Sequence, residues 1–209
     1  MVEPEGRSAR KRQAILDAAA ATFLEHGFVG TTMDQIAAVA GVSKQTVYKH
    51  FGDKQALFTA AVVDIIENAA RRSADEMAGL AAGGDLQHGL EELARATVRV
   101  LTAPPIVRWR RLIIGEADRF PDLARTWHER AIEAGYRSLA ALLAELDAQG
   151  RLRVDDPLRA AQHFHWLALS VPMNTVMFIE KSYSAQEIDD YATSAVRVFL
   201  AAYGVSRRA

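Results

Sequence analysis

The sequence predicts an all-α protein of nine helices, with three small ones at the N-terminus and six mostly longer ones after them. From Arg10 onward, apolar residues recur at three- and four-residue steps, which is the spacing of one helix face. No segment alternates apolar and polar residues over the length of a strand. Glycines, prolines and capping residues separate the helical segments.

The composition is that of a globular protein with a sizeable core. Of the 209 residues, 50% are hydrophobic and 24% are charged. The sequence contains no run of eighteen apolar residues, so no membrane span is predicted. The N-terminus lacks the apolar centre of a signal peptide. The chain has no cysteine, which excludes disulfides and thiolate chemistry and fits a cytoplasmic protein.

The first three helices are the most clearly delimited. Residues 1–8 are polar and predicted to be disordered. The first helix starts near Arg10 and stops at Gly27. Thr32 opens the second with the Thr-x-x-Gln pattern of a capping box, and Ser43 is a good N-cap for the third. Two short helices across a tight turn with glycine form a helix-turn-helix.

A long helix is expected next, capped by Asp53 and running from Lys54 towards Met77, with a glycine-containing linker at 79–84. Pro157 is well placed at a first helical position behind a capping Asp156. The remaining helices are expected at residues 86–101, 106–118, 123–148, 157–181 and 185–203.

The segment GVSKQTVYKHFGDK, residues 41–54, has few residues to bury and many donors and positive charges. A helix that enters the major groove needs short polar side chains in its N-terminal half. Lys can bond guanine acceptors, Gln can bond adenine and Thr can touch a thymine methyl, and Lys44, Gln45 and Thr46 occupy those positions. The segment is therefore predicted to read DNA.

The charge distribution agrees with a local DNA-reading surface. Residues 7–54 hold seven Lys or Arg against four Asp or Glu, a balance of +3. Residues 55–209 hold eighteen against twenty, a balance of −2. A basic surface on a nearly neutral body is typical of a compact DNA-binding module, although a solvated surface without a partner has the same composition.

Residues 10–58, and above all TTMDQIAAVAGVSKQTVYKHFGDKQALF, resemble the DNA-binding domain of the TetR/AcrR family of bacterial transcriptional regulators. The resemblance implies a homodimeric, usually repressing, ligand-responsive protein that binds a palindromic operator. It divides the chain into a DNA-binding domain, 1–54, and a helical ligand-binding and dimerisation domain, 55–209. The candidate DNA contacts are Thr32, Ser43, Lys44, Gln45, Thr46, Tyr48, Lys49, His50 and Lys54.

Within this set Tyr48, His50, Lys44 and Lys49 have alternative interpretations, the two lysines as ordinary solvated side chains. Tyr48 and His50 are suited to bond phosphate, but Tyr48 also fits a partly buried position and His50 a helix cap. By analogy with the family, Lys54 anchors a phosphate at the start of the fourth helix. Arg7, Arg10, Lys11 and Arg12 form either an arm for phosphates or the minor groove, or an exposed tail without a role. Met33 is suited to apolar contact only.

The C-terminal region is expected to bind an apolar or aromatic effector, because such sites are lined by hydrophobic side chains with a few polar groups. Each candidate is also suited to an ordinary core position. They are Trp109, Phe120, Trp127, Tyr136, His163, Trp166, Met173 and Met177.

The last two helices are predicted to form the dimer contact. Residues 160–181 are apolar on nearly every side. A second apolar stripe is expected on the last helix and comprises Ile188, Tyr191, Ala192, Ala195, Val196, Phe199 and Tyr203. Two such helices from each subunit would form a four-helix interface around a two-fold axis.

Enzymatic function is not expected, nor a cofactor or metal. His163 and His165 are two positions apart on a helix and point to different sides, which disfavours a metal site. No glycine-rich phosphate loop or nucleophile elbow is present. The alternative function is a small-molecule-binding or scaffold protein with a vestigial helix-turn-helix.

Overall fold

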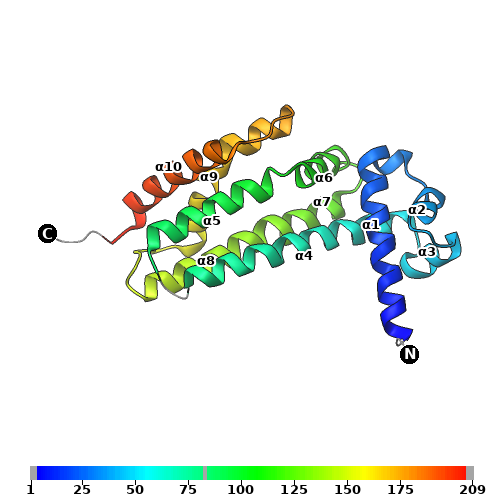
Figure 1. Ribbon diagram of the computed structural model, residues 1–209, viewed down its shortest axis with the longest axis horizontal. Coiled ribbons are helices and arrows are strands. Elements are labelled where there is room, and N and C mark those ends of the chain that lie inside the picture. The colour runs from blue at the N-terminus through cyan, green and yellow to red at the C-terminus, as the bar shows by residue number, and fades with distance from the viewer. Residues whose placement is uncertain (1–3, 82–83, 206–209) are drawn as a thin grey trace. The chain divides into compact units, whose positions relative to one another are not determined.

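The computed structural model describes residues 4–81 and 84–205, with backbone alone for Pro4, Glu5, 69–79 and Ala81 (Figure 1). Over these residues the protein is all-α, as predicted. Taking the continuous run from Pro121 to Ala148 as one helix, the described residues form nine helices and no strand.

The helices are α1 (Pro4–Gly30), α2 (Met33–Val39), α3 (Lys44–Phe51), α4 (Lys54–Ala81), α5 (Leu86–Leu101), α6 (Pro104–Gly115), α7 (Pro121–Trp127), α8 (Ala134–Ala148), α9 (Pro157–Phe178) and α10 (Ala185–Tyr203). A π-helical segment, η1 (His128–Glu133), joins α7 to α8. Within the described ranges, no helix is both long enough and apolar enough to cross a membrane.

Helix α1 starts earlier than predicted, and its axis breaks at the predicted Gly27 although the helix continues to Gly30. The expected disorder over residues 1–8 is wrong for residues 4–8, which are helical, while residues 1–3 lie outside the described part. Pro4 suits the first turn of a helix, and the alanines and long basic residues that follow are strong helix formers. At Gly27, with φ 69° and ψ 175°, the axis breaks before one more turn.

The predicted N-caps of α2, α3 and α4 are confirmed. Each was predictable because it depends only on neighbouring residues. The Thr32 N–H donates to the Gln35 side chain at 2.8 Å, and the Gln35 N–H donates back to the Thr32 hydroxyl at 3.2 Å. The Ser43 hydroxyl accepts from the Thr46 N–H at 3.2 Å. Asp53 accepts from the Ala56 N–H at 2.8 Å.

Backbone contacts divide the chain into two compact units, each of which is described by itself. The first, the head unit, comprises the residues up to Asn68 together with Arg108–Trp127. The second, the body unit, comprises Ala69–Val107 and the residues from His128 onward. The functional boundary at residue 54 stays a prediction.

The head unit is built around an aromatic cluster. Phe58 of α4 lies 4.7 Å from Phe23 and 5.1 Å from Phe28, measured between ring centroids. Trp109 of α6 lies 5.8 Å from Phe58, and Phe120 lies 4.4 Å from Phe28. The segment Arg108–Trp127 therefore belongs to the core that supports the short helices, although it follows them by more than fifty positions in the sequence.

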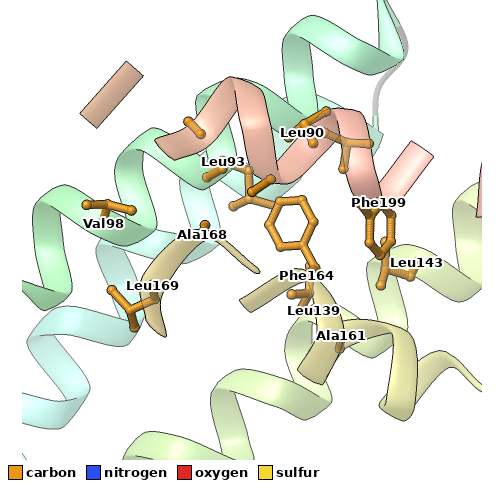
Figure 2. Close-up of a cluster of buried hydrophobic side chains, with 14 of the residues drawn as sticks. Leu90, Leu93, Val98, Leu139, Leu143, Ala161, Phe164, Ala168, Leu169 and Phe199 are labelled. Carbon is orange, nitrogen blue, oxygen red and sulfur yellow. The ribbon is translucent and has the colours of Figure 1, made fainter. Parts of the chain in front are cut away.

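The body unit is a helical bundle in which α9 packs against α5, α8 and α10. Figure 2 shows side chains from these four helices around the ring of Phe164. Phe164 and Phe199 are both buried and meet edge to face at 5.2 Å between ring centroids. A half-buried ion network adds to this packing, since Arg95 of α5 donates to Asp189 of α10 and to Glu91 and Glu92.

The first turn of α10 carries a carboxylate with unusually strong partners. Glu187 accepts hydrogen bonds from the Lys181 ammonium at 2.9 Å and from the N–H and hydroxyl of Ser184 at 2.9 and 3.0 Å. These donors favour the ionised form, led by Lys181, and lower the pKa of Glu187 to about 2.

We expect the wild type to unfold at a higher temperature than Glu187→Gln above about pH 5. Because an unfolded glutamate titrates near pH ~4.3, the stabilisation from Glu187 is complete above that pH and is lost as the pH falls towards the lowered pKa. Thermal unfolding of both proteins between pH 3 and 7 measures the difference. Lys181→Met should reduce it, and a pH-independent difference would contradict the assignment.

Candidate functional site

Helix α3 is held on one side and leaves the other to solvent. Val47 is fully buried, while Val42 and Phe51 are partly buried. Gly41, with φ 65°, provides the left-handed turn between α2 and α3, and the Val42 N–H donates to the Ala37 carbonyl at 3.1 Å. Buried contacts and local caps therefore orient α3 without using its polar side.

The polar side of α3 presents most of the predicted DNA contacts together. Lys44, Gln45, Tyr48 and Lys49 are exposed, with Tyr48 at 43%, whereas Thr46 and His50 are half-buried. His50 lies beside Phe51, with 6.2 Å between the ring centroids. An exposed row of donors on a short, well-supported helix has the geometry required of a major-groove reader.

Lys44 has an acidic partner that the sequence patterns did not reveal. Its ammonium lies 2.9 Å from an oxygen of Asp34 in the first turn of α2, and both side chains are more than half exposed. The hydrogen bond and charge of Asp34 raise the pKa of Lys44. The pair links the two helices of the motif and places a negative charge next to the polar side of α3.

Asp34→Asn should strengthen binding to non-specific DNA by roughly two- to fivefold, the scale of an exposed ion pair. The substitution releases Lys44 and removes a charge that repels phosphates, while a neutral Asn keeps the shape of the side chain. Titration of a random-sequence duplex at fixed salt measures the effect. Asp17→Asn is the matched control, because Asp17 accepts from Gln13 and not from a lysine. An equal gain in both variants would show that only net charge matters.

Three of the predicted DNA-contact hydroxyls, those of Thr32, Ser43 and Thr46, already have partners within the head. The Ser43 hydroxyl bonds the Thr46 hydroxyl at 2.8 Å, and the Thr32 hydroxyl donates to Gln35 at 2.9 Å. Thr32 and Ser43 lie at helix starts and are exposed, and Thr46 is half-buried. Met33, next to Thr32, is buried and belongs to the head core.

Lys54, the remaining predicted contact, points to the corner between α1 and α2. Its ammonium donates to the carbonyls of Phe28 at 2.9 Å and Thr31 at 2.8 Å, with the Val29 carbonyl at 3.5 Å. It also lies 4.6 Å from the centre of the Phe28 ring. The ammonium of Lys54 is therefore bound by backbone carbonyls of the head unit itself.

The basic residues at the N-terminus lie on the exposed first turns of α1. An intact helix is about 10–12 Å wide, and the minor groove is about 6 Å wide, so this segment cannot enter that groove as it is folded. Arg12 lies over the ring of Phe51 at 5.4 Å and so also supports α3. Arg10 and Lys11 are exposed and can therefore still contact phosphates.

Three of the eight effector candidates lie in the head unit. Trp109 is 1% exposed and Trp127 is 7% exposed, and Phe120 contacts Phe28. All three have the packing of ordinary core or core-edge residues. Their position in the same unit as α3 was not evident from the sequence, because the contacts are long-range.

The other five candidates lie in the body unit and do not form one cluster. Met173 is buried in the core, and Met177 packs against that core. Tyr136, His163 and Trp166 line an open hollow of about 740 Å³ on α8, α9 and α10. The other residues of the hollow are Arg159, Gln162, Leu167, Ser170, Val198, Phe199, Ala202 and Tyr203.

The prediction that the apolar stripe of α10 forms the dimer contact is wrong for five of its seven residues, which are buried inside their own subunit, whereas Tyr191 and Tyr203 are half-buried. Ile188, Ala192 and Phe199 are buried in the core of the body unit. The large apolar residues of α9 and α10 that are exposed are different ones: Leu158, Trp166, Leu167, Val171, Phe178 and Val198, with Ile179 and Val205 just beyond the two helices. On helices that are apolar on several sides, periodicity alone does not tell the inner side from the outer.

Comparison with known protein families matches both parts of the chain. Residues 15–61 match the family described as bacterial regulatory proteins, tetR family. Residues 88–205 match the C-terminal domain of AefR-like transcriptional repressors.

Individual relatives extend the match over most of the chain. The transcriptional repressor AcnR of Corynebacterium efficiens is 32% identical over 152 residues, which cover 70% of this chain and 71% of AcnR. A TetR-family regulator from Mesorhizobium loti is 40% identical, with a TM-score of 0.92, over 95% of this chain and 99% of that one. The flavonoid-responsive regulator FrrA is 34% identical, with a TM-score of 0.75, over 96% and 100%.

The helices α2 and α3, with a buried side and an exposed polar side on α3, form a helix-turn-helix in an all-α chain. This is the architecture of a DNA-binding protein, and the comparisons agree. The chain belongs to the TetR family of bacterial transcriptional regulators. It is a DNA-binding transcriptional regulator, as predicted, and its relatives include repressors. Proteins of this family bind DNA operators and small-molecule effectors and act as dimers.

Proposed function

We propose that the protein represses transcription by binding a near-palindromic operator as a homodimer and releasing it when an effector binds. The observation that carries this proposal is the exposed polar side of α3, on a helix whose other side is anchored by Val47. The role is regulatory, not enzymatic, and we place it in the cytoplasm, where operators are found. Two copies of α3 would enter successive major grooves about 34–36 Å apart.

We propose that Lys44, Gln45 and Thr46 face base edges, because they occupy the first turn of α3. Tyr48, Lys49 and His50 follow in the next turn and are suited to bond phosphates. Ser43 and Thr32 sit at the N-caps of α3 and α2, where helix ends favour phosphate oxygens. The phosphate contacts would position the head on the duplex, and the base contacts would read its sequence.

We propose that the dimer forms through the exposed apolar residues of α9 and α10. Trp166, Leu167 and Val171 on α9 and Val198 on α10 are each at least 41% exposed, an unusual amount of apolar surface for neighbouring helices of one unit. A second copy related by a two-fold axis would cover these residues. The hollow at Tyr136, His163 and Trp166 lies among them, so we assign it to the dimer contact and not to the effector.

The proposed effector is apolar or aromatic. Supporting observations are the aromatic and methionine content of the C-terminal region and the similarity to FrrA, which is flavonoid-responsive. The effector must bind the DNA-incompetent state more tightly, since equal affinity for both states shifts nothing. A panel of flavonoids and other planar aromatics should include compounds that release bound operator, and release by charged, hydrophilic compounds alone would contradict this class.

Selection of bound duplexes from a random DNA pool tests the function as a whole. We expect a near-palindrome with half-sites centred about one helical turn apart, since a two-fold dimer presents two identical α3 helices. Affinity for that sequence should also fall steeply with salt. Recovery of weak binders without a common sequence would favour a small-molecule-binding protein with a vestigial helix-turn-helix.

A further inference from the structure

We propose that Asp34 and Lys44 read one base pair of the operator together. The Lys44 ammonium donates to the acceptors of a guanine, and the Asp34 carboxylate accepts from the amino group of the paired cytosine. Asp34 is then a specificity-determining residue. This inference rests on the proposed operator binding by α3, and it adds a base contact from α2 and the identity of one base pair.

The two side chains form a close ion pair across the helix-turn-helix. The Lys44 ammonium lies 2.9 Å from one oxygen of the Asp34 carboxylate and 3.0 Å from the other. Lys44 is the first residue of α3 and Asp34 is the second residue of α2, so the pair joins the starts of the two helices. The side chains are 55% and 65% exposed, which leaves both charged groups accessible from solvent.

This ion pair does not use up the hydrogen-bonding capacity of either group. A lysine ammonium has three N–H donors, and the two oxygens of a carboxylate have about four lone-pair sites. The hydrogen bond between them takes one donor and one such site. A ligand that offers acceptors next to a donor can therefore bond both members of the pair without separating them.

A G·C base pair has this pattern in the major groove. Guanine presents the acceptors N7 and O6, and cytosine presents its N4 amino group beside O6. Lysine on guanine and aspartate on the cytosine amino group are both favourable pairings. In an A·T pair the amino group of adenine lies between two acceptors, which would repel the carboxylate. The ion pair is therefore complementary to G·C.

The carboxylate also disfavours a phosphate as the partner of Lys44. If Lys44 left Asp34 for a phosphate, the carboxylate would lose its partner close to further negative charge. On a G·C pair the ion pair stays intact and both of its members gain partners. Asp34 thus favours base edges over the sugar–phosphate backbone as the partner of Lys44.

The test selects duplexes from a random DNA pool with the full-length wild type, with Asp34→Ala and with Lys44→Met, each verified as folded by circular dichroism. Asp34 is exposed and lies outside the capping box of Thr32 and Gln35, so alanine is compatible with the fold. The matched control is Asp17→Ala, which replaces an exposed acid of α1.

We expect the wild type to select one G·C pair in each half-site at which both variants lose their preference. Titration of operators that carry each of the four base pairs at this position measures the effect. The wild type should prefer G·C, with cytosine on one particular strand, by roughly tenfold for each half-site, and Asp34→Ala should reduce this to about twofold or less. Asp17→Ala should keep the preference of the wild type.

The inference would be overturned if the position affected by Asp34→Ala were not a G·C pair, or if the two variants affected different positions. Tighter binding of Asp34→Ala to every sequence, with an unchanged preference, would also overturn it, because Asp34 would then act only by repelling phosphates. A wild type that selects no common sequence would instead refute the proposed operator function, so the two failures are distinguishable.

Discussion

A variant with Lys44, Tyr48 and Lys49 all replaced by alanine should lose operator affinity by roughly a thousandfold or more, yet fold and dimerise normally. The three side chains are exposed on one side of α3, so their removal leaves the buried Val47 and the head core intact. Each base or phosphate contact typically contributes a factor of about ten or more to affinity, and three from each subunit are removed together.

Fluorescence anisotropy with labelled operator measures the loss, and circular dichroism with size-exclusion chromatography verifies fold and assembly. The charge-matched control replaces Arg99 and Arg153, exposed residues of the body unit, by alanine. The control should bind almost as well as the wild type. Unchanged affinity of the α3 variant would refute the assignment of this surface to DNA.

A variant with Leu167→Glu and Val198→Glu should be monomeric at concentrations where the wild type is a dimer. The two residues are 41% and 49% exposed in the isolated chain, so glutamate is tolerated in the monomer. In a two-fold interface the same substitutions place four carboxylates in contact with apolar surface. Burial of unpaired charge should raise the dimer dissociation constant by more than about a hundredfold.

Sedimentation equilibrium measures that constant, and operator titrations should show a parallel loss, because one head reads only half of a palindrome. Ile114→Glu is the matched control: Ile114 is 60% exposed but lies in the head unit. A double variant that stays dimeric would place the interface on another surface.

The start and end of each short helix were predictable because they depend on neighbours in the sequence. Thr32 and Gln35 complete a capping box, and Asp156 caps α9 as expected, accepting from the Arg159 N–H at 3.0 Å. The donor and acceptor in such a cap are three residues apart, so no tertiary contact is needed to form it. The polar side of α3 was predictable for the same reason.

Local patterns predicted less where a residue has two suitable environments. Residues 4–8 are polar, yet they continue α1, since the helix formers after them extend it backwards. Residues 123–148 form the predicted long helix, with a π-helical segment at His128–Glu133 that periodicity did not reveal. Met33 sits beside an N-cap but is buried in the head core.

Interactions within one or two turns of the chain define the helices, their caps and the polar side of α3, and for that reason the sequence alone was enough to predict them. The fold was needed to show that the Lys54 ammonium donates to the carbonyls of Phe28 and Thr31, and which side of α10 is buried within its own subunit. These features depend on residues far apart in the sequence. The Lys54 ammonium meets acceptors more than twenty positions away, and the buried side of α10 depends on helices that precede it by many more.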